Sequence, residues 1–346
     1  MSTLETNAIG KYSGNNVSVD DALNLKSYTT AQRDALTSVA GDSIYNSTTN
    51  KPQYYDGSAW QDMAGAGFDT AFLVIAGGGG GGGVNNAGGG GAGGYRNSYA
   101  SETSGGGNTT EEVFKSLKST NYTVTVGAGG TGVGASSFIG GRGNDSLYGN
   151  VVSVGGGGGK SSQGTTFSGI TGGVGGSGGG NPFDGSGTGN EGITNQGFAG
   201  GTGNISSPFQ GGGGGGAAEA GNTDATGAGG DGLASSITGS SVTRAGGGSG
   251  ATNDGSTISG GDGGGGNGGY SGNAPTSGTA NTGGGGGGGG VASTTGGNGG
   301  SGIVILRYPT ADATITVGAG LTSSSATDGS DTVVSFTAGT GTVSFA

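Results

Sequence analysis

One stretch, residues 72–98, constrains the fold more than any other part of the chain. An apolar run from Phe72 to Ile75 is followed, after one alanine, by seven glycines, and all but eleven of the chain's 98 glycines lie between residues 77 and 302. Glycine loses more conformational freedom on folding than any other residue and has no side chain to bury. The central region is therefore either a flexible linker or a fold held together by its backbone.

A period of three favours the second interpretation. Three residues per turn is the period of a polyproline-II-type helix, which here would carry side chains on one edge and bare backbone elsewhere. Such helices can bond to one another only where no Cβ intervenes, so a hexagonal bundle is expected to need glycine at two of every three positions. Side chains recur at this spacing around Gly-Gly in the pairs Ala92/Tyr95, Ala128/Thr131, Val174/Ser177, Ala199/Thr202, Ala228/Asp231, Asn267/Tyr270 and Asn298/Ser301.

Apolar strands adjoin these glycine runs. The segments at 72–76, 122–126, 150–154 and 300–308 have the β-branched and aromatic content of strands, and most lie directly beside a glycine run. We predict a mostly β protein in which a polyglycine-II helix bundle is clamped by strands. Its expected domains are an attachment segment (1–27), a small α+β module (28–66), the glycine-rich domain (67–310) and a C-terminal β oligomerisation segment (311–346).

The two ends have ordinary composition. Residues 29–36 predict a short helix, with Thr29 and Gln32 spaced as a capping box. Three short strands are expected at 43–46, 52–56 and 58–63, with Asp56-Gly57 as a two-residue hairpin turn. Tyr45, Tyr54, Tyr55 and Trp60 are expected to fill a small core. Three more strands are expected after residue 312, and their edges are expected to pair with the same tail of another chain.

Composition excludes several classes of function. The chain has no cysteine and no histidine, which removes Cys and His nucleophiles, the Ser-His-Asp triad, common zinc sites and disulfides. Its net charge of −11 argues against nucleic-acid binding. Carboxylates are spread thinly through the loops. We therefore expect no enzyme activity, no cofactor and no metal ion. The first ten residues lack the features of a signal peptide, so export by the general secretory route is not expected.

Two motifs resemble ligand-binding sequences. Residues 140–148 match one calcium-binding β-roll nonapeptide, but that architecture needs consecutive repeats and the next nine residues lack the aspartate. Residues 154–162 resemble a phosphate-binding loop around Lys160, yet Val154 replaces the first glycine and no helix-forming stretch follows. Both are expected to be structural.

Aromatic residues in the connections between glycine runs are the remaining candidates for a site. Phe183 and Phe209 each follow a proline, and Phe167 and Tyr270 lie in glycine- and serine-rich connections. A proline stiffens a loop, and an aromatic ring offers much contact area per residue. These four residues either contact a receptor or cap the ends of the bundle and shield it from water.

The segments at 72–98, 122–130 and 299–309 resemble the glycine-rich domain of tailed-phage tail-fibre proteins and adhesins, and residues 40–63 resemble a short module of phage appendage proteins. The resemblance covers roughly residues 28 to 310. It implies a polyglycine-II sandwich whose tip loops bind a host receptor, either a protein or a glycan. It also implies a homotrimer that contacts other virion proteins through residues 1–27. The protein would be made in the host cytoplasm and located in the virion.

A second class of function stays open at this point. The chain could be a capsid fibre or decoration protein, or a self-assembling extracellular filament without receptor specificity. An ice-binding protein would need regularly spaced Thr or Ala on one face, and a bacterial surface adhesin would need an export signal.

Overall fold

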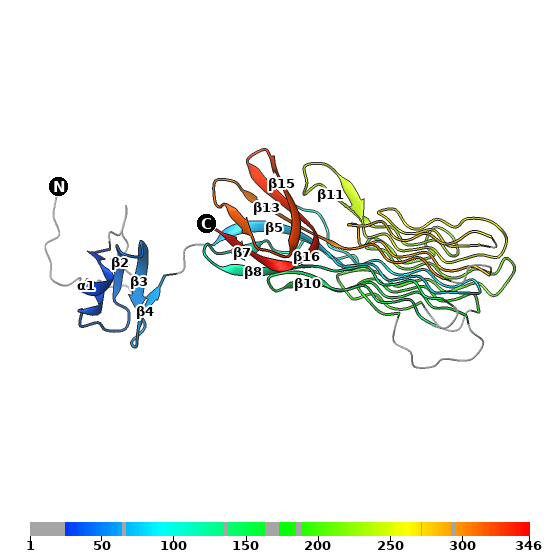
Figure 1. The fold of residues 1–346 in the computed structure, drawn as a ribbon, viewed down its shortest axis with the longest axis horizontal. Coiled ribbons are helices and arrows are strands. Elements are labelled where there is room, and N and C mark those ends of the chain that lie inside the picture. The colour runs from blue at the N-terminus through cyan, green and yellow to red at the C-terminus, as the bar shows by residue number, and fades with distance from the viewer. Residues whose placement is uncertain are drawn as a thin grey trace, which may run out of the picture. The chain divides into compact units, whose positions relative to one another are not determined.

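The computed structural model describes residues 25–63, 67–134, 138–162, 173–184, 189–270, 272–291 and 295–346. The chain divides into two compact units, Met1–Ala66 and Gly67–Ala346, drawn in Figure 1. Most residues of the predicted attachment segment, 1–24, lie outside the described residues. Among the described residues, no helix has the length and apolar character needed to cross a membrane.

The N-terminal unit is a four-stranded sheet with one short helix. Helix α1 (Thr30–Asp34) begins at the capping box of Thr29 and Gln32, as predicted. The strand order is β1-β2-β3-β4, with β1 parallel to β2 and the other pairs antiparallel. The strands are β1 (Ser27–Tyr28), β2 (Ser43–Asn46), β3 (Lys51–Tyr55) and β4 (Trp60–Asp62).

The hairpin between β3 and β4 differs from the two-residue turn that was predicted. Tyr55 pairs with Trp60, so the loop has four residues, from Asp56 to Ala59. The Asp56 carboxylate accepts the N–H groups of Ser58 (2.7 Å) and Ala59 (2.8 Å). These bonds, with the Ala59 contact contributing most, hold the pKa of Asp56 well below its usual range. The aspartate side chain thus closes a longer loop than the Asp-Gly pair alone would form.

The second unit is built on a ten-stranded sheet with the main order β10-β9-β8-β16-β13-β5-β6, to which β14 and β15 add on β16 and β7 adds on β5. A separate ribbon is formed by β11 and β12, and the prediction of a mostly β protein is confirmed. The strands are β5 (Phe68–Ile75), β6 (Tyr95–Asn97), β7 (Phe114–Ser116), β8 (Asn121–Val126), β9 (Ser146–Tyr148), β10 (Val151–Ser153), β11 (Leu233–Ser235), β12 (Val242–Arg244), β13 (Ile303–Pro309), β14 (Ile315–Val317), β15 (Leu321–Asp328) and β16 (Asp331–Phe345).

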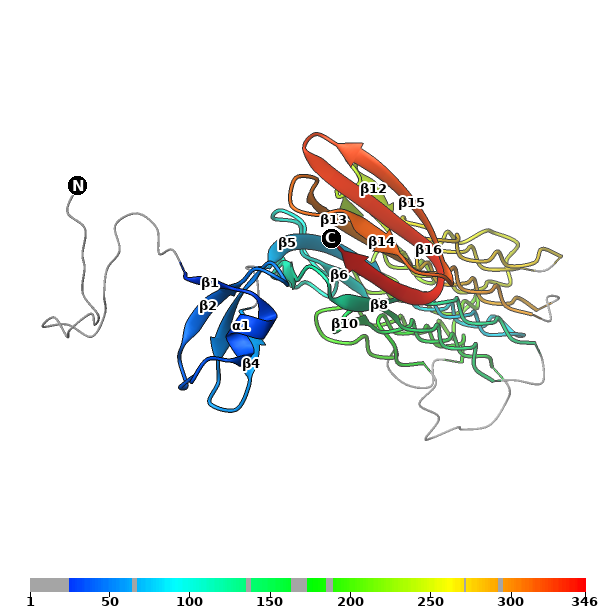
Figure 2. The same ribbon diagram turned by 60° about the vertical axis from the view of Figure 1, so that its left-hand side comes forward.

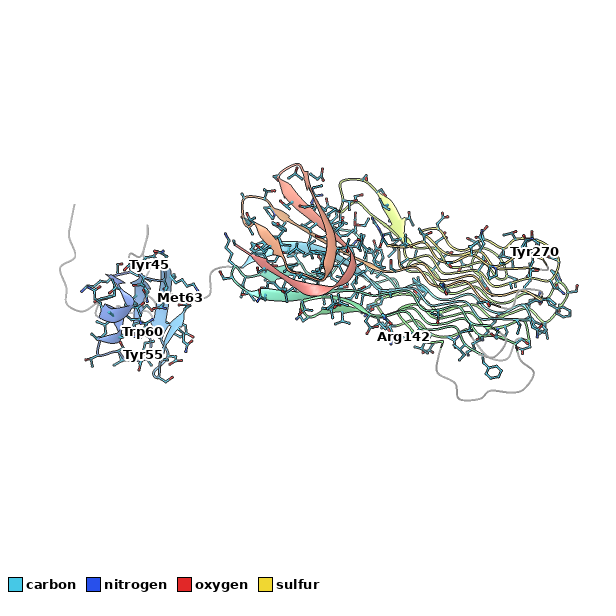
Figure 3. All side chains as sticks on the ribbon, viewed as in Figure 1. Tyr45, Tyr55, Trp60, Met63, Arg142 and Tyr270 are labelled. Carbon is cyan, nitrogen blue, oxygen red and sulfur yellow. The ribbon has the colours of Figure 1, made fainter. Side chains whose placement is uncertain are left out.

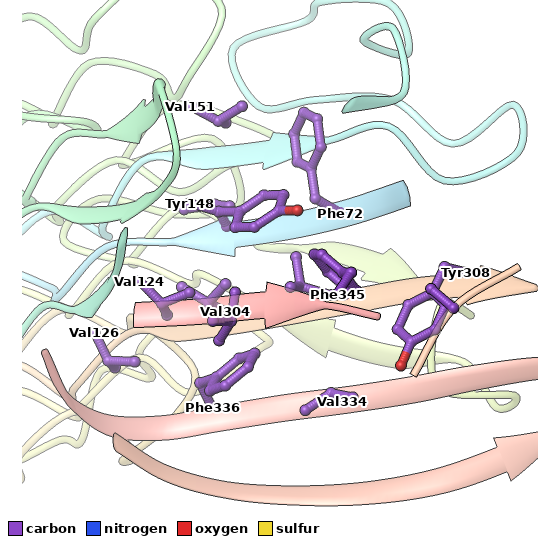
Figure 4. Close-up of a cluster of buried hydrophobic side chains, with 14 of the residues drawn as sticks. Phe72, Val124, Val126, Tyr148, Val151, Val304, Tyr308, Val334, Phe336 and Phe345 are labelled. Atoms are coloured by element: carbon purple, nitrogen blue, oxygen red, sulfur yellow. The ribbon is translucent and has the colours of Figure 1, made fainter. Parts of the chain in front are cut away.

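Hydrophobic residues pack on both faces of the central strands. Alternate residues of β5 and β13 enter one cluster with Tyr148, Phe336 and Phe345, which Figure 4 shows. The residues between them enter a second cluster, in which Ile75 and Ile305 pack with Ile237 from outside the sheet. Two buried faces explain why the sequence shows a continuous apolar run from Phe72 to Ile75.

The C-terminal strands belong to this same sheet. The first part of β16 lies between β13 and β15, and its second part lies between β8 and β14 (Figure 2). The expected oligomerisation segment from residue 311 therefore finds strand partners within its own chain. Strand β15, whose residues 322–327 are all exposed, is the outer strand beside β16.

The glycine runs form extended segments, which we call glycine rods, that leave the sheet and bond to one another. Gly79 in the rod 77–83 shows the pattern. Its N–H donates to Gly91 O (2.8 Å), and its carbonyl accepts from Gly286 N (2.9 Å). A Cβ built on Gly79 would lie 2.1 Å from Gly157 O. The N–H group of Gly79, its carbonyl and the position that a Cβ would take therefore each face the backbone of another rod.

The hydrogen bonds of the rod 77–83 repeat every third residue, which is the period of a polyglycine-II-type helix. Its N–H groups donate to three antiparallel rods, and its carbonyls accept from three parallel ones. The donor partners lie in residues 88–91, 141–144 and 297–300, and the acceptor partners lie in residues 130–133, 156–159 and 286–289. Six bonded neighbours make this rod the centre of a hexagonal arrangement.

The number of neighbours decides how much glycine a rod needs. The central rod 77–83 carries glycine at every position, more than the two in three that was expected, because no side of it faces solvent. The rod 127–134 lies at the edge of the bundle, and its Ala128 and Thr131 side chains are exposed. The period of three seen in the sequence thus marks the outer rods. Ala92, Tyr95 and Ser177 are exceptions, since all three are fully buried.

Candidate functional site

The rods end in turns on the side of the bundle opposite the sheet. The chain leaves β5 along the rod 77–83, turns at 84–86 and returns along 87–94 to β6. Other turns at this end of the bundle are linked by backbone contacts. Phe183 N donates to Asn86 O (3.2 Å), which links the turn at 181–184 to the turn at 84–86. Gln210 forms an antiparallel β-bridge with Thr252, and Thr252 N donates to Gly269 O (3.2 Å). We call the described residues of the turns at 84–86, 181–184, 204–210, 252–258, 270 and 272–273 the rod-end surface.

Two of the predicted site residues meet on this surface. The rings of Phe183 and Phe209 lie 5.4 Å apart between centroids, at an interplanar angle of 63°. Edge-to-face contact of this kind is a favourable arrangement for aromatic rings. Both side chains are half-buried. A half-buried ring can shield the rod ends and still be accessible to a partner. Capping the bundle and contacting a receptor are therefore compatible roles for these two residues.

The loop that carries Phe209 is held by its own side chains. Asn204 donates through its side-chain amide to Pro208 O (3.3 Å) and accepts from Ser206 N (3.0 Å). Its backbone N–H donates to Gln210 O (2.8 Å), which closes the loop. Phe209 N donates to the side chain of Asn253 (3.0 Å), which ties this loop to the next turn. The backbone that carries Phe209 is thus held by hydrogen bonds within its own loop and to the next turn.

Of the other two candidates, the structure describes Tyr270. Tyr270 lies at the end of the bundle away from the sheet, as Figure 3 shows. It exchanges backbone hydrogen bonds with Asn273 (3.2 and 2.9 Å) and is half-buried. Phe167 lies outside the described residues.

Two exposed apolar side chains at the ends of rods were not predicted as site residues. Ile205, in the loop that carries Phe209, is 65% exposed, and Val291, which follows the rod 283–290, is 56% exposed. Ile205 lies three residues before the pair Pro208 and Phe209, and this proximity in sequence could have identified it as part of the same exposed loop. In the turn at 84–86, Asn86 is buried, and its Oδ1 has no hydrogen-bond partner among the described residues.

The structure also gathers three carboxylates that were not expected to lie together. Glu219, Asp224 and Asp231 each offer an oxygen within 4.8 Å of the others, the one such group of possible metal ligands in the described ranges. Burial, and then the charges of Asp224 and Asp231, raise the pKa of Glu219. Asp224 and Asp231 also line a groove of about 450 Å³ between residues 224–231 and 257–262.

The two ligand-binding motifs have structural roles. Asp145, in the nonapeptide at 140–148, pairs with Arg142 (2.9 Å) and accepts from Gly155 N (2.8 Å). The run 155–160 is a glycine rod whose last residue, Lys160, donates its N–H to Gly180 O (3.0 Å), and no helix begins at Ser161 or Ser162. Burial lowers the pKa of Lys160.

A sheet that holds a bundle of backbone-bonded glycine rods, with apolar side chains gathered at the rod ends, defines this unit as a rod-bundle scaffold. The family model described as "Glycine-rich domain" matches residues 49–309, and the chain belongs to that family. No curated protein and no solved structure matches the chain.

Proposed function

We propose that the chain is a non-enzymatic bacteriophage virion protein, a tail-fibre or appendage subunit whose glycine-rich domain binds a receptor on the host cell. The observation that carries this proposal is the rod-end surface. There, the rings of Phe183 and Phe209 pack together, and Ile205 is exposed in the hydrogen-bonded loop that carries Phe209. Apolar groups gathered at one end of a scaffold are typical of an interaction site.

The scaffold suits a binding function because its rods leave little freedom to lose. A loop held in place before binding has less conformational entropy to lose when a partner arrives. The fully described turns at 84–86, 204–210 and 252–258 each join rods that bond to their neighbours. Such turns can vary in sequence without disturbing the backbone contacts beneath them.

The proposed partners follow from this role. They are other copies of the chain in a homotrimer, other tail or virion proteins, and a cell-surface protein or glycan of the host. Several copies on one particle would multiply weak individual contacts into stable attachment. The proposed location is the virion, after synthesis in the host cytoplasm, with no nucleic acid among the partners.

The test is binding of the labelled full chain to a panel of bacterial strains, read by flow cytometry. We expect saturable binding to a subset of strains, weakened by about tenfold or more in a variant carrying Phe183→Ala and Phe209→Ala. Leu117→Ala is the matched control, because Leu117 is an exposed apolar residue directly after β7, in the sheet. Equal binding by the double variant and the wild-type chain would exclude the two rings as receptor contacts.

A structural role without receptor specificity is the second candidate. It is favoured by β15, an eight-residue outer strand that contains no lysine or proline to discourage pairing with another chain. Open-ended polymers, together with no saturable binding to any strain, would support a capsid fibre, a decoration protein or an extracellular filament.

A further inference from the structure

The N-terminal unit has a polar interior, which leaves its aromatic residues near the surface. Asn46 and Gln53 are buried and bonded to each other (3.0 Å), and Arg33 donates to the same Gln53 oxygen (2.9 Å). Tyr55 and Trp60, expected in the core, are only half-buried. Their rings are therefore available to something outside the unit.

These two rings line a cavity between α1 and the β3–β4 hairpin, with a volume of about 400 Å³. Cavities of about 300–1,000 Å³ with apolar walls and a few polar groups are typical of small-molecule sites. The ring centroids of Tyr55 and Trp60 lie 5.5 Å apart, with their planes at 57°. The rings form the apolar wall, and the polar lining comes from Arg33, Asp34, Ser38 and Ser58.

Several polar groups at this cavity have unused hydrogen-bonding capacity. The Ser38 hydroxyl oxygen is buried and has no hydrogen-bond partner within the described part of the chain. A buried hydroxyl without a partner is unfavourable unless a ligand or water satisfies it. Three of the five Arg33 N–H donors are used, two by Asp34 and one by Gln53. Asp34 accepts those two bonds through Oδ1 and none from described residues through Oδ2.

The charges of the cavity cancel. Arg33 and Asp34, which form an ion pair of 2.7 Å, are the only charged residues in the described lining. A charged ligand would have to compete with this pair for its partner. A neutral ligand with several hydroxyl groups could use the free donors and acceptors without breaking it.

We propose that this cavity binds a neutral saccharide residue. A pyranose ring has apolar C–H faces, which suit the walls formed by Tyr55 and Trp60, and neighbouring hydroxyls at its rim. Those hydroxyls can accept from Arg33, donate to Asp34 Oδ2 and satisfy Ser38. The site lies in a different unit from the rod-end surface and does not depend on the function proposed for that surface.

Trp60 provides the assay, because it is the single tryptophan of the chain. The full-length protein is titrated with the methyl glycosides of glucose, galactose, mannose and N-acetylglucosamine, while tryptophan fluorescence is recorded. We expect a saturable change with at least one of them and none with N-acetylneuraminic acid, which is anionic. A response that is linear, or equal to the response to glycerol, for all four glycosides would overturn the proposal.

Adjacent tyrosines supply a matched pair of variants. Tyr55→Ala should weaken binding by about tenfold, the size of one aromatic contact. Tyr54→Ala should leave binding unchanged, because Tyr54 is exposed on the other face of β3 and does not line the cavity. An equal loss in both variants would contradict the assignment. The Trp60 indole N–H resonance gives a second readout, and amide dispersion in the same NMR spectrum reports whether each variant is folded.

A charge variant tests the argument for a neutral ligand. Asp34→Asn leaves Arg33 without its carboxylate and gives the cavity a net positive charge. We expect this variant to gain saturable binding of N-acetylneuraminic acid and to bind the neutral glycoside more weakly. Unchanged preference for the neutral glycoside would show that the Arg33–Asp34 pair does not set specificity. The rod-end variants Phe183→Ala and Phe209→Ala should leave the Trp60 titration unaltered, which separates this site from receptor binding.

Discussion

Gly79 shows what one methyl group would do to this fold. A Cβ there would lie 2.1 Å from Gly157 O and 2.5 Å from its carbonyl carbon, where no flexible side chain can move aside. We predict that Gly79→Ala lowers the free energy of unfolding by about 3 kcal/mol, the upper end of overpacking costs. Thr131→Ala is the control, since Thr131 projects to solvent from an edge rod. Chemical denaturation of both variants would measure the difference, and equal stability would contradict the close rod packing.

Glu219 gives a pH dependence whose sign can be stated. Its pKa is raised in the folded state, so the favourable contribution of its protonated form is lost as pH rises through the folded pKa. Glutamine does not ionise, so Glu219→Gln should not lose stability as the pH rises. We expect its melting temperature to exceed that of the wild type at pH 7 and to be similar near pH 4, where the wild-type carboxyl is protonated in the folded state. Scanning calorimetry with a chelator present measures this without contributions from cations. A lower melting temperature for the variant at pH 7 would mean that the ionised carboxylate is stabilising.

At the scale of elements, β16 holds the sheet together. Phe336 is fully buried in the larger cluster, opposite Val304 of β13. We predict that Phe336→Ala costs about 3–5 kcal/mol of stability, the usual range for a buried phenylalanine. Ser325→Ala, on the exposed strand β15, should change stability by less than about 0.5 kcal/mol. Comparable destabilisation of the two variants in urea would place the core elsewhere.

Individual elements could be predicted from the sequence more accurately than which elements lie beside one another. The apolar run Phe72–Ile75 and the capping box at Thr29 depend on local chemistry, and both predictions were confirmed. Which rods lie beside the rod 77–83 depends on contacts across most of the chain, because all glycine runs are locally alike. Trp60 was expected in the core because its ring is large. The buried Asn46–Gln53 hydrogen bond, which occupies that interior, has no signature in local sequence.

The candidate site was predicted only in part, for the same reason. The Pro-Phe pairs located Phe183 and Phe209 in loops, but their contact joins two loops whose pairing depends on the order of the rods. Glu219, Asp224 and Asp231 are separated in sequence and meet only because the chain folds back at 218–231.

At the scale of the whole molecule, we expect the oligomeric state to depend on the outer strand β15. We predict a solution mass of three times the 31.9 kDa chain, measured by light scattering after size exclusion. Replacing Thr322 and Ser324 by lysine should reduce this mass to that of one chain, because charges on an outer strand oppose strand addition. Removing residues 311–346 would not serve as a test, since it deletes the strand that carries Phe336. A trimer that persists in the lysine variant would place the interface elsewhere.

The pairing of β5 with β13 has a consequence for biosynthesis. Ala71–Ile75 bond to Ile303–Arg307, about two-thirds of the chain away, and the rod 77–83 bonds to residues 297–300. Contacts between such distant residues form late, because closing long loops is entropically unfavourable. During translation, the rod 77–83 therefore leaves the ribosome long before two of its six neighbours, residues 286–289 and 297–300, have been synthesised. The scarcity of apolar side chains in the glycine runs limits aggregation in that interval, and the bundle is completed only when its last rod has been synthesised.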